Sequence, residues 1–172
     1  ELPPLSLYIH LPWCVQKCPY CDFNSHAVKD SLPEELYVNA LMQDLDTHLA
    51  MAQERPLLSI FFGGGTPSLF SPLMIERILQ GVFARLKTAK NIEITLEANP
   101  GTIDAVRFKD FRSAGINRIS LGLQSLQNDK LATLGRIHDS AQAMRAIDIA
   151  KNAGFDNFNL DLMFALPSQT LV

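Results

Sequence analysis

The sequence has 172 residues, of which 47% are hydrophobic and 19% are charged, and its formal net charge is −3. This length can bury one sizeable core, and the composition is that of a globular domain rather than a disordered chain. Acidic and basic residues are mixed along the chain, which argues against a basic surface for nucleic acid. No apolar run approaches the roughly 18 residues that a transmembrane segment requires, and the N-terminus lacks a signal-peptide pattern.

Apolar patterning predicts five strands that alternate with helices. Strands are expected over about 5–11, 57–62, 92–97, 117–123 and 157–163, and helices over about 33–53, 72–86, 102–115 and 140–153. The continuously apolar run at 57–62 is typical of a strand buried on both faces of a parallel sheet. The alternation predicts an α/β fold with right-handed crossovers, either an open doubly wound sheet or a (β/α) barrel. A closed barrel needs more strands, so we expect the chain to be a fragment.

The three cysteines of the chain lie close together, at Cys14, Cys18 and Cys21. An odd, clustered set does not fit a secreted disulfide framework, so we expect the reducing cytoplasm. Soft thiolate ligands at this spacing favour an iron–sulfur cluster or zinc. A [4Fe–4S] cluster held by three cysteines leaves one iron free to bind a small molecule. The alternative is a zinc site that His10 or His26 completes.

Unusual polar or glycine-rich residues stand at the ends of the predicted strands. In chain order they are the cysteine segment, Gly63-Gly64-Gly65-Thr66-Pro67, Glu97, Gln124 with Ser125, and Asp161. Ligands of parallel sheets bind beyond the carboxyl ends of the strands, so these groups should meet at one mouth. Each also has a structural explanation. The glycines can form a tight turn, Glu97 can be a helix-terminal charge, Gln124 a buried amide, and Asp161 a cap of the following loop.

Several motifs then occur together in a fixed order. The spacing Cys14-x3-Cys18-x2-Cys21, with an aromatic residue before the last cysteine, is followed by Gly-Gly-Gly-Thr-Pro. This order resembles the radical S-adenosylmethionine (radical SAM) superfamily. Further motifs are Tyr8-Ile9-His10-Leu11-Pro12-Trp13, Glu97-Ala98-Asn99-Pro100-Gly101, Gly122-Leu123-Gln124-Ser125, Leu134-Gly135-Arg136 and Asp161-Leu162. They resemble the branch that contains oxygen-independent coproporphyrinogen III oxidase and the HemW heme chaperones.

One position separates these two groups. The oxidase carries a further cysteine two positions after the third, whereas this chain has Phe23 there. At this position the chain resembles the heme chaperones. The resemblance implies heme binding and transfer rather than porphyrinogen oxidation. The oxidase remains one alternative, and a zinc-stabilised, non-enzymatic α/β binding module is another.

The resemblance implies an N-terminal portion of a radical SAM partial barrel, covering residues 1–172. Cys14, Cys18 and Cys21 would hold a [4Fe–4S] cluster whose open iron takes the amino and carboxylate groups of S-adenosylmethionine. Electron transfer to this ligand would release a 5′-deoxyadenosyl radical, while the protein supplies position and redox tuning. Residues implied to bind S-adenosylmethionine are Tyr8, Tyr20, Gly64, Gly65, Thr66, Glu97, Gln124, Arg136 and Asp161, with Arg136 suited to the carboxylate. Heme would be bound mainly outside this chain and passed to a heme-accepting protein.

A local departure from the family pattern lies after the fifth predicted strand. Relatives usually have glycine before the Leu-Pro pair, whereas this chain has Ala165. Alanine is tolerated there unless φ is positive, in which case it costs about 1 kcal/mol or more.

Overall fold

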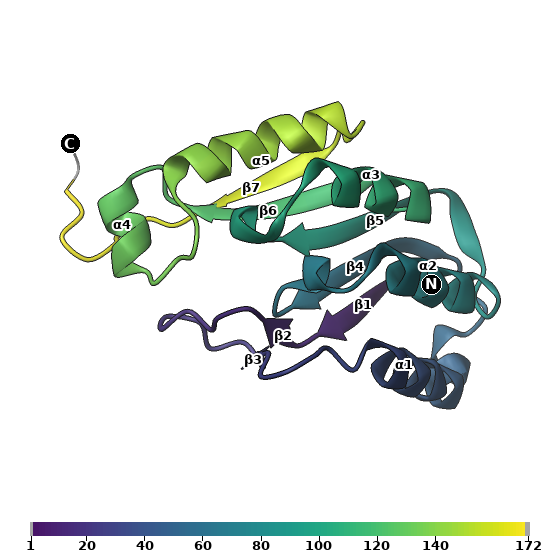
Figure 1. Ribbon diagram of the computed structural model, residues 1–172. Coiled ribbons are helices and arrows are strands. Elements are labelled where there is room, and N and C mark those ends of the chain that lie inside the picture. The colour runs from purple at the N-terminus through teal and green to yellow at the C-terminus, as the bar shows by residue number, and fades with distance from the viewer. Residues whose placement is uncertain (1, 171–172) are drawn as a thin grey trace.

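A five-stranded parallel sheet organises the computed structural model, which describes residues 2–170 (Figure 1). Its strands are β1 (Leu5–Leu11), β4 (Leu57–Gly64), β5 (Thr88–Ala98), β6 (Arg118–Gln124) and β7 (Phe158–Leu162). Their order in the sheet, β1-β4-β5-β6-β7, is their order in the chain. A doubly wound sheet reverses its strand order at a switch point, so the unreversed order is that of a partial (β/α) barrel. The α/β fold predicted from the sequence is therefore confirmed.

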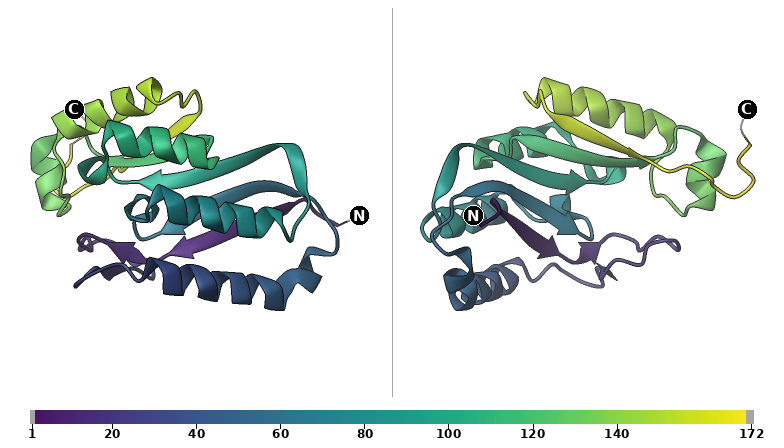
Figure 2. Two further views of the ribbon diagram at one scale, coloured as in Figure 1. Left: turned by 45° about the vertical axis from the view of Figure 1, so that its right-hand side comes forward. Right: turned by 180° about the vertical axis from the view of Figure 1, so that it is seen from behind.

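Helices connect the strands, and the longer ones lie along one face of the sheet, whereas the shortest lies beyond the carboxyl ends of the strands (Figures 1 and 2). They are α1 (Glu34–His48), α2 (Pro72–Phe83), α3 (Ala105–Ala114), α4 (Asn128–Thr133) and α5 (Ser140–Asn152). The core between helices and sheet is built from alternate strand residues, such as Phe62, Leu96 and Leu121, all fully buried. No helix within residues 2–170 is long and apolar enough to cross a membrane.

The opposite face of the sheet is not covered by helices, as the view from behind shows (Figure 2). The prediction that the strand at 57–62 is buried on both faces is therefore wrong. Ser59 and Phe61 are only partly buried, whereas Ile60 and Phe62 are fully buried. A register shift between Leu57 and Ser59 interrupts this alternation at Leu58, which is 44% exposed. Successive side chains of a strand point to opposite faces, so only alternate residues of β4 reach the helices.

Short elements account for the differences at the helix ends. The predicted helix over 33–53 is shorter, because α1 ends at His48 and a 3₁₀ turn, η1 (Leu49–Ala52), follows it. The helix expected from about 102 begins at Ala105, since η3 (Pro100–Thr102) precedes it and Asp104 is its N-cap, accepting a hydrogen bond from the Arg107 amide. The six-residue α4 was not expected from the sequence, because it is too short to show a helical period.

Candidate functional site

A cavity of about 360 Å³ opens at the carboxyl ends of the strands. Its lining includes residues of β4, β5, β6 and β7 and of the cysteine segment that follows β1, as the parallel topology requires. Of the residues singled out in the sequence, the lining contains Cys14, Cys18, Tyr20, Cys21, Gly64, Gly65, Thr66, Glu97, Gln124, Arg136 and Asp161. It also contains Gln16, Lys17, Phe23, Ser25, Ala98, Asn99, Ser120 and Gly122, for which no ligand contact was expected. The motifs therefore converge on one mouth.

Tyr8 does not belong to this lining. Its hydroxyl lies 3.0 Å from Nδ1 of His10, and its ring stacks on Phe61 with 6.2 Å between ring centroids. Burial raises the pKa of Tyr8, and the nearby Glu97 carboxylate raises it further. Tyr8 thus lies beside the cavity, on the same sheet face as Glu97, and its expected contact with a ligand stays a prediction.

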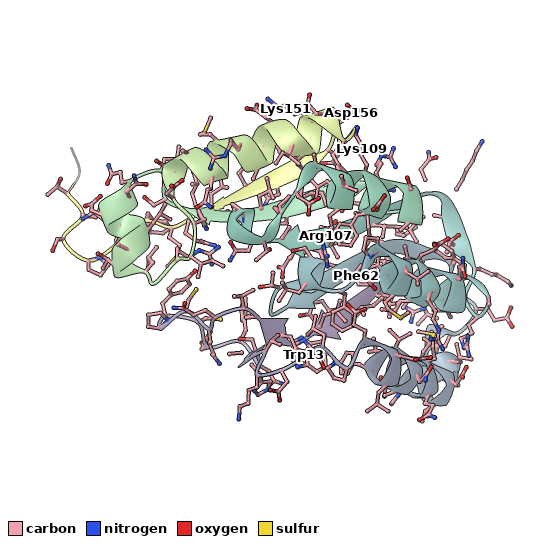
Figure 3. The ribbon with its side chains drawn as sticks, viewed as in Figure 1. Trp13, Phe62, Arg107, Lys109, Lys151 and Asp156 are labelled. Carbon is pink, nitrogen blue, oxygen red and sulfur yellow. The ribbon has the colours of Figure 1, made fainter. Side chains whose placement is uncertain are left out.

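The cysteine segment is anchored at both ends by two short paired strands, β2 (Trp13–Cys14) and β3 (His26–Ala27). Trp13, labelled in Figure 3, begins the segment, and its ring packs edge-on against Tyr37 with centroids 4.7 Å apart. Cys14 is buried, Cys18 and Cys21 are half-buried, and none of the three forms a disulfide. Three free thiols that line one cavity fit a cluster held by three cysteines.

The histidines considered for a zinc site have other partners. His10 contacts the Tyr8 hydroxyl through Nδ1 and the Asn24 carbonyl oxygen, 2.8 Å away, through Nε2. Nε2 of His26 lies 3.1 Å from Oδ1 of Asn24. Across residues 2–170, no three His, Cys, Asp or Glu side chains are grouped so that they could hold a single metal ion. A Cys3His zinc site would require His10 or His26 to give up these contacts.

The glycine-rich loop lies directly against the chain that leads into the cysteine segment. The amide of Gly65 donates to the Leu11 carbonyl (2.8 Å), and the amide of Thr66 donates to the Trp13 carbonyl (2.7 Å). A Cβ atom at Gly65 would lie 2.6 Å from that Trp13 oxygen. Gly64 has φ of 121°, and a Cβ atom there would meet the His10 ring at 2.7 Å. The loop needs glycine because the two backbones approach too closely for a side chain.

Arg107 of α3, which was not expected from the sequence, holds the turn that follows the glycines (Figure 3). Its guanidinium donates to the carbonyls of Ser68, Leu69 and Phe70 at 2.9, 2.6 and 2.8 Å. These carbonyls end the 3₁₀ turn η2 (Pro67–Leu69), and the Phe70 ring packs on Trp13 at 5.7 Å. Arg107 therefore positions the loop from behind the cavity. A helix arginine carries no sequence signal for this role, because its partners are main-chain atoms.

Two carboxylates lie on the face of the sheet that the helices do not cover, on β5 and β7. Oε2 of Glu97 accepts a hydrogen bond from the Gly64 amide at 3.3 Å. Burial raises the pKa of Glu97 to about 7, and the Asp161 carboxylate adds to this rise. Asp161 accepts hydrogen bonds from Ser120 Oγ (3.2 Å) and Asn159 Nδ2 (2.7 Å). The pair offers fixed acceptors to a cationic or hydroxyl-bearing ligand.

Arg136 supplies positive charge to the same cavity. Its Nη2 donates to the Gly122 carbonyl at 2.7 Å, and its Nη1 lies 3.4 Å from the Tyr20 hydroxyl and 3.5 Å from Cys18 Sγ. Its Nε is buried and has no hydrogen-bond partner within the described part of the chain. Buried polar groups are rarely left unpaired, so this donor fits an anionic ligand group such as a carboxylate.

Gln124 ends β6 in a left-handed backbone conformation, with φ of 67°. The register between β6 and β7 shifts here, and the Gln124 carbonyl accepts a hydrogen bond from the Met163 amide at 2.9 Å. A non-glycine residue in this region costs about 1 kcal/mol or more and is typical of functional sites. Gln124 is one of the residues that line the cavity.

Comparisons with known proteins identify the family of this chain. The model of the radical SAM superfamily matches residues 8–171. The heme chaperone HemW of Escherichia coli (strain K12) is 57% identical over 171 residues, which cover 99% of this chain and 45% of HemW. The mitochondrial radical S-adenosyl methionine domain-containing protein 1 of Danio rerio is 39% identical, over 96% of this chain and 37% of its own. The chain thus spans less than half the length of these curated relatives.

Structural similarity leads to the same branch. The structure of coproporphyrinogen III oxidase (HemN) from Escherichia coli, a radical SAM enzyme, superposes with a TM-score of 0.87 at 28% sequence identity. The match covers 97% of this chain and 38% of HemN. The resemblance to the HemW and HemN branch is therefore confirmed, and membership implies a [4Fe–4S] cluster and S-adenosylmethionine. On the residues matched and on the fold, the chain belongs to the radical SAM superfamily.

Proposed function

We propose that this chain holds a [4Fe–4S] cluster and S-adenosylmethionine in the cavity at the carboxyl ends of its strands, as the N-terminal part of a heme chaperone. The proposal rests on one observation. Three free thiols, the glycine-rich loop, two carboxylates and an arginine all line the same cavity of about 360 Å³. These groups match the parts of the proposed ligand. Thiols suit iron, Arg136 suits a carboxylate, and Glu97 and Asp161 suit ammonium or ribose hydroxyl groups.

Each residue then has a definite task in binding. Cys14, Cys18 and Cys21 would ligate three irons, and the bound cluster would supply the single electron that cleaves S-adenosylmethionine. Gly65 keeps the loop against the Trp13 carbonyl, so that a ligand can approach the backbone closely. Arg136 would donate a hydrogen bond from its unpaired Nε to the carboxylate of S-adenosylmethionine.

The choice of heme chaperone rests on sequence similarity and on Phe23. Its side chain is 61% exposed and lines the cavity at the position where the oxidase has a further cysteine. The relative named heme chaperone HemW is 57% identical over 99% of this chain, whereas HemN is 28% identical. Transfer to a heme-accepting protein and a location in the cytoplasm belong to the same proposal. Porphyrinogen oxidation is the second candidate, favoured by the TM-score of 0.87 with HemN.

Anaerobic reconstitution with iron and sulfide tests the cofactor part. We expect about four irons and four sulfides per chain with cluster absorbance in the visible range. Cys18→Ala should lose the cluster and remain folded. The matched change Ser113→Ala, at an exposed residue of α3, should keep it. Stoichiometric zinc without sulfide would instead support the zinc-stabilised binding module.

Heme titration and a turnover assay with coproporphyrinogen, both on the complete natural protein, separate the two functions. Stable heme binding without decarboxylation is the expected result. Robust decarboxylation without heme binding would assign the oxidase activity and overturn the chaperone proposal.

A further inference from the structure

We propose that Arg136 also acts on the cluster itself, by donating a hydrogen bond to the sulfur of Cys18 and so raising the reduction potential of the cluster. The inference rests on the proposed function, in which Cys18 is a cluster ligand. It adds a redox role to the carboxylate contact that the family resemblance implies for this arginine.

The contact joins two residues that are far apart in the chain. Nη1 of Arg136 lies 3.5 Å from Cys18 Sγ, across 118 positions of sequence. The other half-buried thiol, Cys21, contacts a neutral group, the Ser25 hydroxyl, at 3.9 Å. Over the described residues, Cys18 is the one thiol with a hydrogen bond from a cationic side chain. A charge-assisted bond of this kind is stronger than one from a neutral donor.

The local backbone is built for this approach. Gly135 has φ of 67°, and a Cβ atom there would lie 2.8 Å from Cδ of Pro19. The segment that carries Arg136 therefore packs directly on the cysteine segment, and Figure 1 shows the α4 region beside that loop. Cys18 Sγ is also 4.0 Å from the Gly135 carbonyl. Only glycine permits this conformation at this distance without strain.

The guanidinium is held in place before any ligand binds. Its Nη2 donates to the Gly122 carbonyl at 2.7 Å, and the Arg136 amide donates to the Leu131 carbonyl at 2.9 Å. Two residues further on, Nε2 of the buried His138 lies 3.2 Å from the Leu123 carbonyl, which ties the same segment to β6. A group that is fixed in this way loses little entropy when it interacts with a thiolate.

Reduction of the cluster adds one negative charge, and no bond is formed or broken. Hydrogen bonds to the ligating sulfurs and nearby positive charge favour the more negative, reduced state and so raise the potential. Arginine keeps its charge at every relevant pH, and the half-buried position of Arg136 limits screening by water. Since Nε remains unpaired while Nη1 faces the sulfur, both roles can operate together.

A potentiometric titration of the reconstituted complete protein, with dithionite and redox mediators and without S-adenosylmethionine, tests the inference. The reduced cluster is measured by electron paramagnetic resonance in the wild type, Arg136→Gln, Arg136→Lys and Arg145→Gln. Arg136→Gln should lower the ratio of reduced to oxidised cluster about tenfold at a fixed potential, a shift of about 59 mV for one electron. Arg136→Lys keeps the charge but loses the planar guanidinium group, so it should shift the reduction potential less. The control Arg145→Gln removes the same charge from the exposed surface of α5 and should cause no shift.

The outcomes are distinct. Weaker binding of S-adenosylmethionine by Arg136→Gln with an unchanged potential would assign the arginine to the carboxylate alone and overturn the inference. If Arg136→Gln does not retain a cluster, Arg136→Met, which also removes the charge and the hydrogen-bond donors, is titrated in its place, and an unchanged potential there has the same meaning. A wild-type protein that assembles no cluster would overturn the proposed function instead.

Discussion

Consecutive residues of one strand meet two different environments in this protein. Phe62, labelled in Figure 3, is fully buried beneath the helices. Its neighbour Phe61 lies on the bare face of the sheet and is only partly buried. On β5 and β6 the bare face carries polar residues, and the side chains of Arg118 and Thr95 are linked at 3.3 Å. The interior of a closed (β/α) barrel is usually filled by branched apolar residues. On β5 and β6 the bare face is therefore specialised for polar contacts, and the helix face for stability.

The difference between the faces also explains the position of the site. The carboxyl-end residues of the bare face, Glu97, Gln124 and Asp161, line the cavity. The neighbours of Glu97 and Gln124 in the chain, Leu96, Ala98 and Leu123, are buried and apolar, whereas those of Asp161, Leu160 and Leu162, are exposed. Stability and ligand binding thus depend on alternate residues of the same strands. Substitutions on the two faces should therefore have separable effects.

The largest expected effect is on the helix face. Phe62→Ala should lower the free energy of unfolding by about 3–5 kcal/mol, because it leaves a cavity in the packed core. Phe61→Ala, the matched change on the bare face, should cost about 1–2 kcal/mol, since its ring is partly solvated. Urea denaturation of the two variants measures both values. Equal losses would contradict the distinction between the faces.

The next effect concerns the charge of Glu97. Burial raises the pKa of this carboxyl group in the folded state to about 7, from 4.5. The folded state therefore favours the protonated form. The stabilisation is complete below pH 4.5 and is lost as the pH rises through 7. Glu97→Gln should remove this loss, about 1–2 kcal/mol after allowance for solvent in the cavity. Unfolding measured from pH 4 to 8 checks it, with the exposed Glu76→Gln on α2 as control. A wild-type curve parallel to that of Glu97→Gln would show that Glu97 does not titrate in this window.

A smaller effect is expected at the end of β6. Gln124→Ala should weaken S-adenosylmethionine binding about tenfold, or about 1.4 kcal/mol, through loss of side-chain hydrogen bonds. The cluster content and the free energy of unfolding should not change. Gln127→Ala is the matched control, because Gln127 is exposed and lies outside the cavity lining. Calorimetric titration compares the two, and unchanged affinity in Gln124→Ala would remove this residue from the site.

The smallest effect follows from Ala165, which has φ of 57°. The strain expected if φ were positive at this position therefore applies, and Ala165→Gly should stabilise the protein by up to about 1 kcal/mol. The same change in the middle of α1, Ala40→Gly, should destabilise it by about 0.5–1 kcal/mol. Thermal unfolding distinguishes the two signs. A lower melting temperature for Ala165→Gly would show that the left-handed conformation carries no cost there.

Much of the site was predictable because topology converts sequence order into spatial position. Once strands and helices alternate, the carboxyl ends of parallel strands must meet at one edge, so the motifs after 11, 62, 97, 123 and 161 converge. Tyr8 lies on the face expected for it but outside the cavity lining, and its contact with a ligand stays a prediction. Ser120 was missed, since a strand serine carries no signal until its partner, Asp161, is known.

The sequence by itself determined the alternation of elements, the cysteine spacing, the glycine cradle and the family, because each depends on residues that are neighbours along the chain. Only the tertiary structure decided which face of the sheet is bare, where Gln124 becomes left-handed, and that Arg136 reaches the sulfur of Cys18. Periodicity records whether a residue is buried. It does not record which atoms meet, because contacts across 118 positions are set by the packing of whole elements.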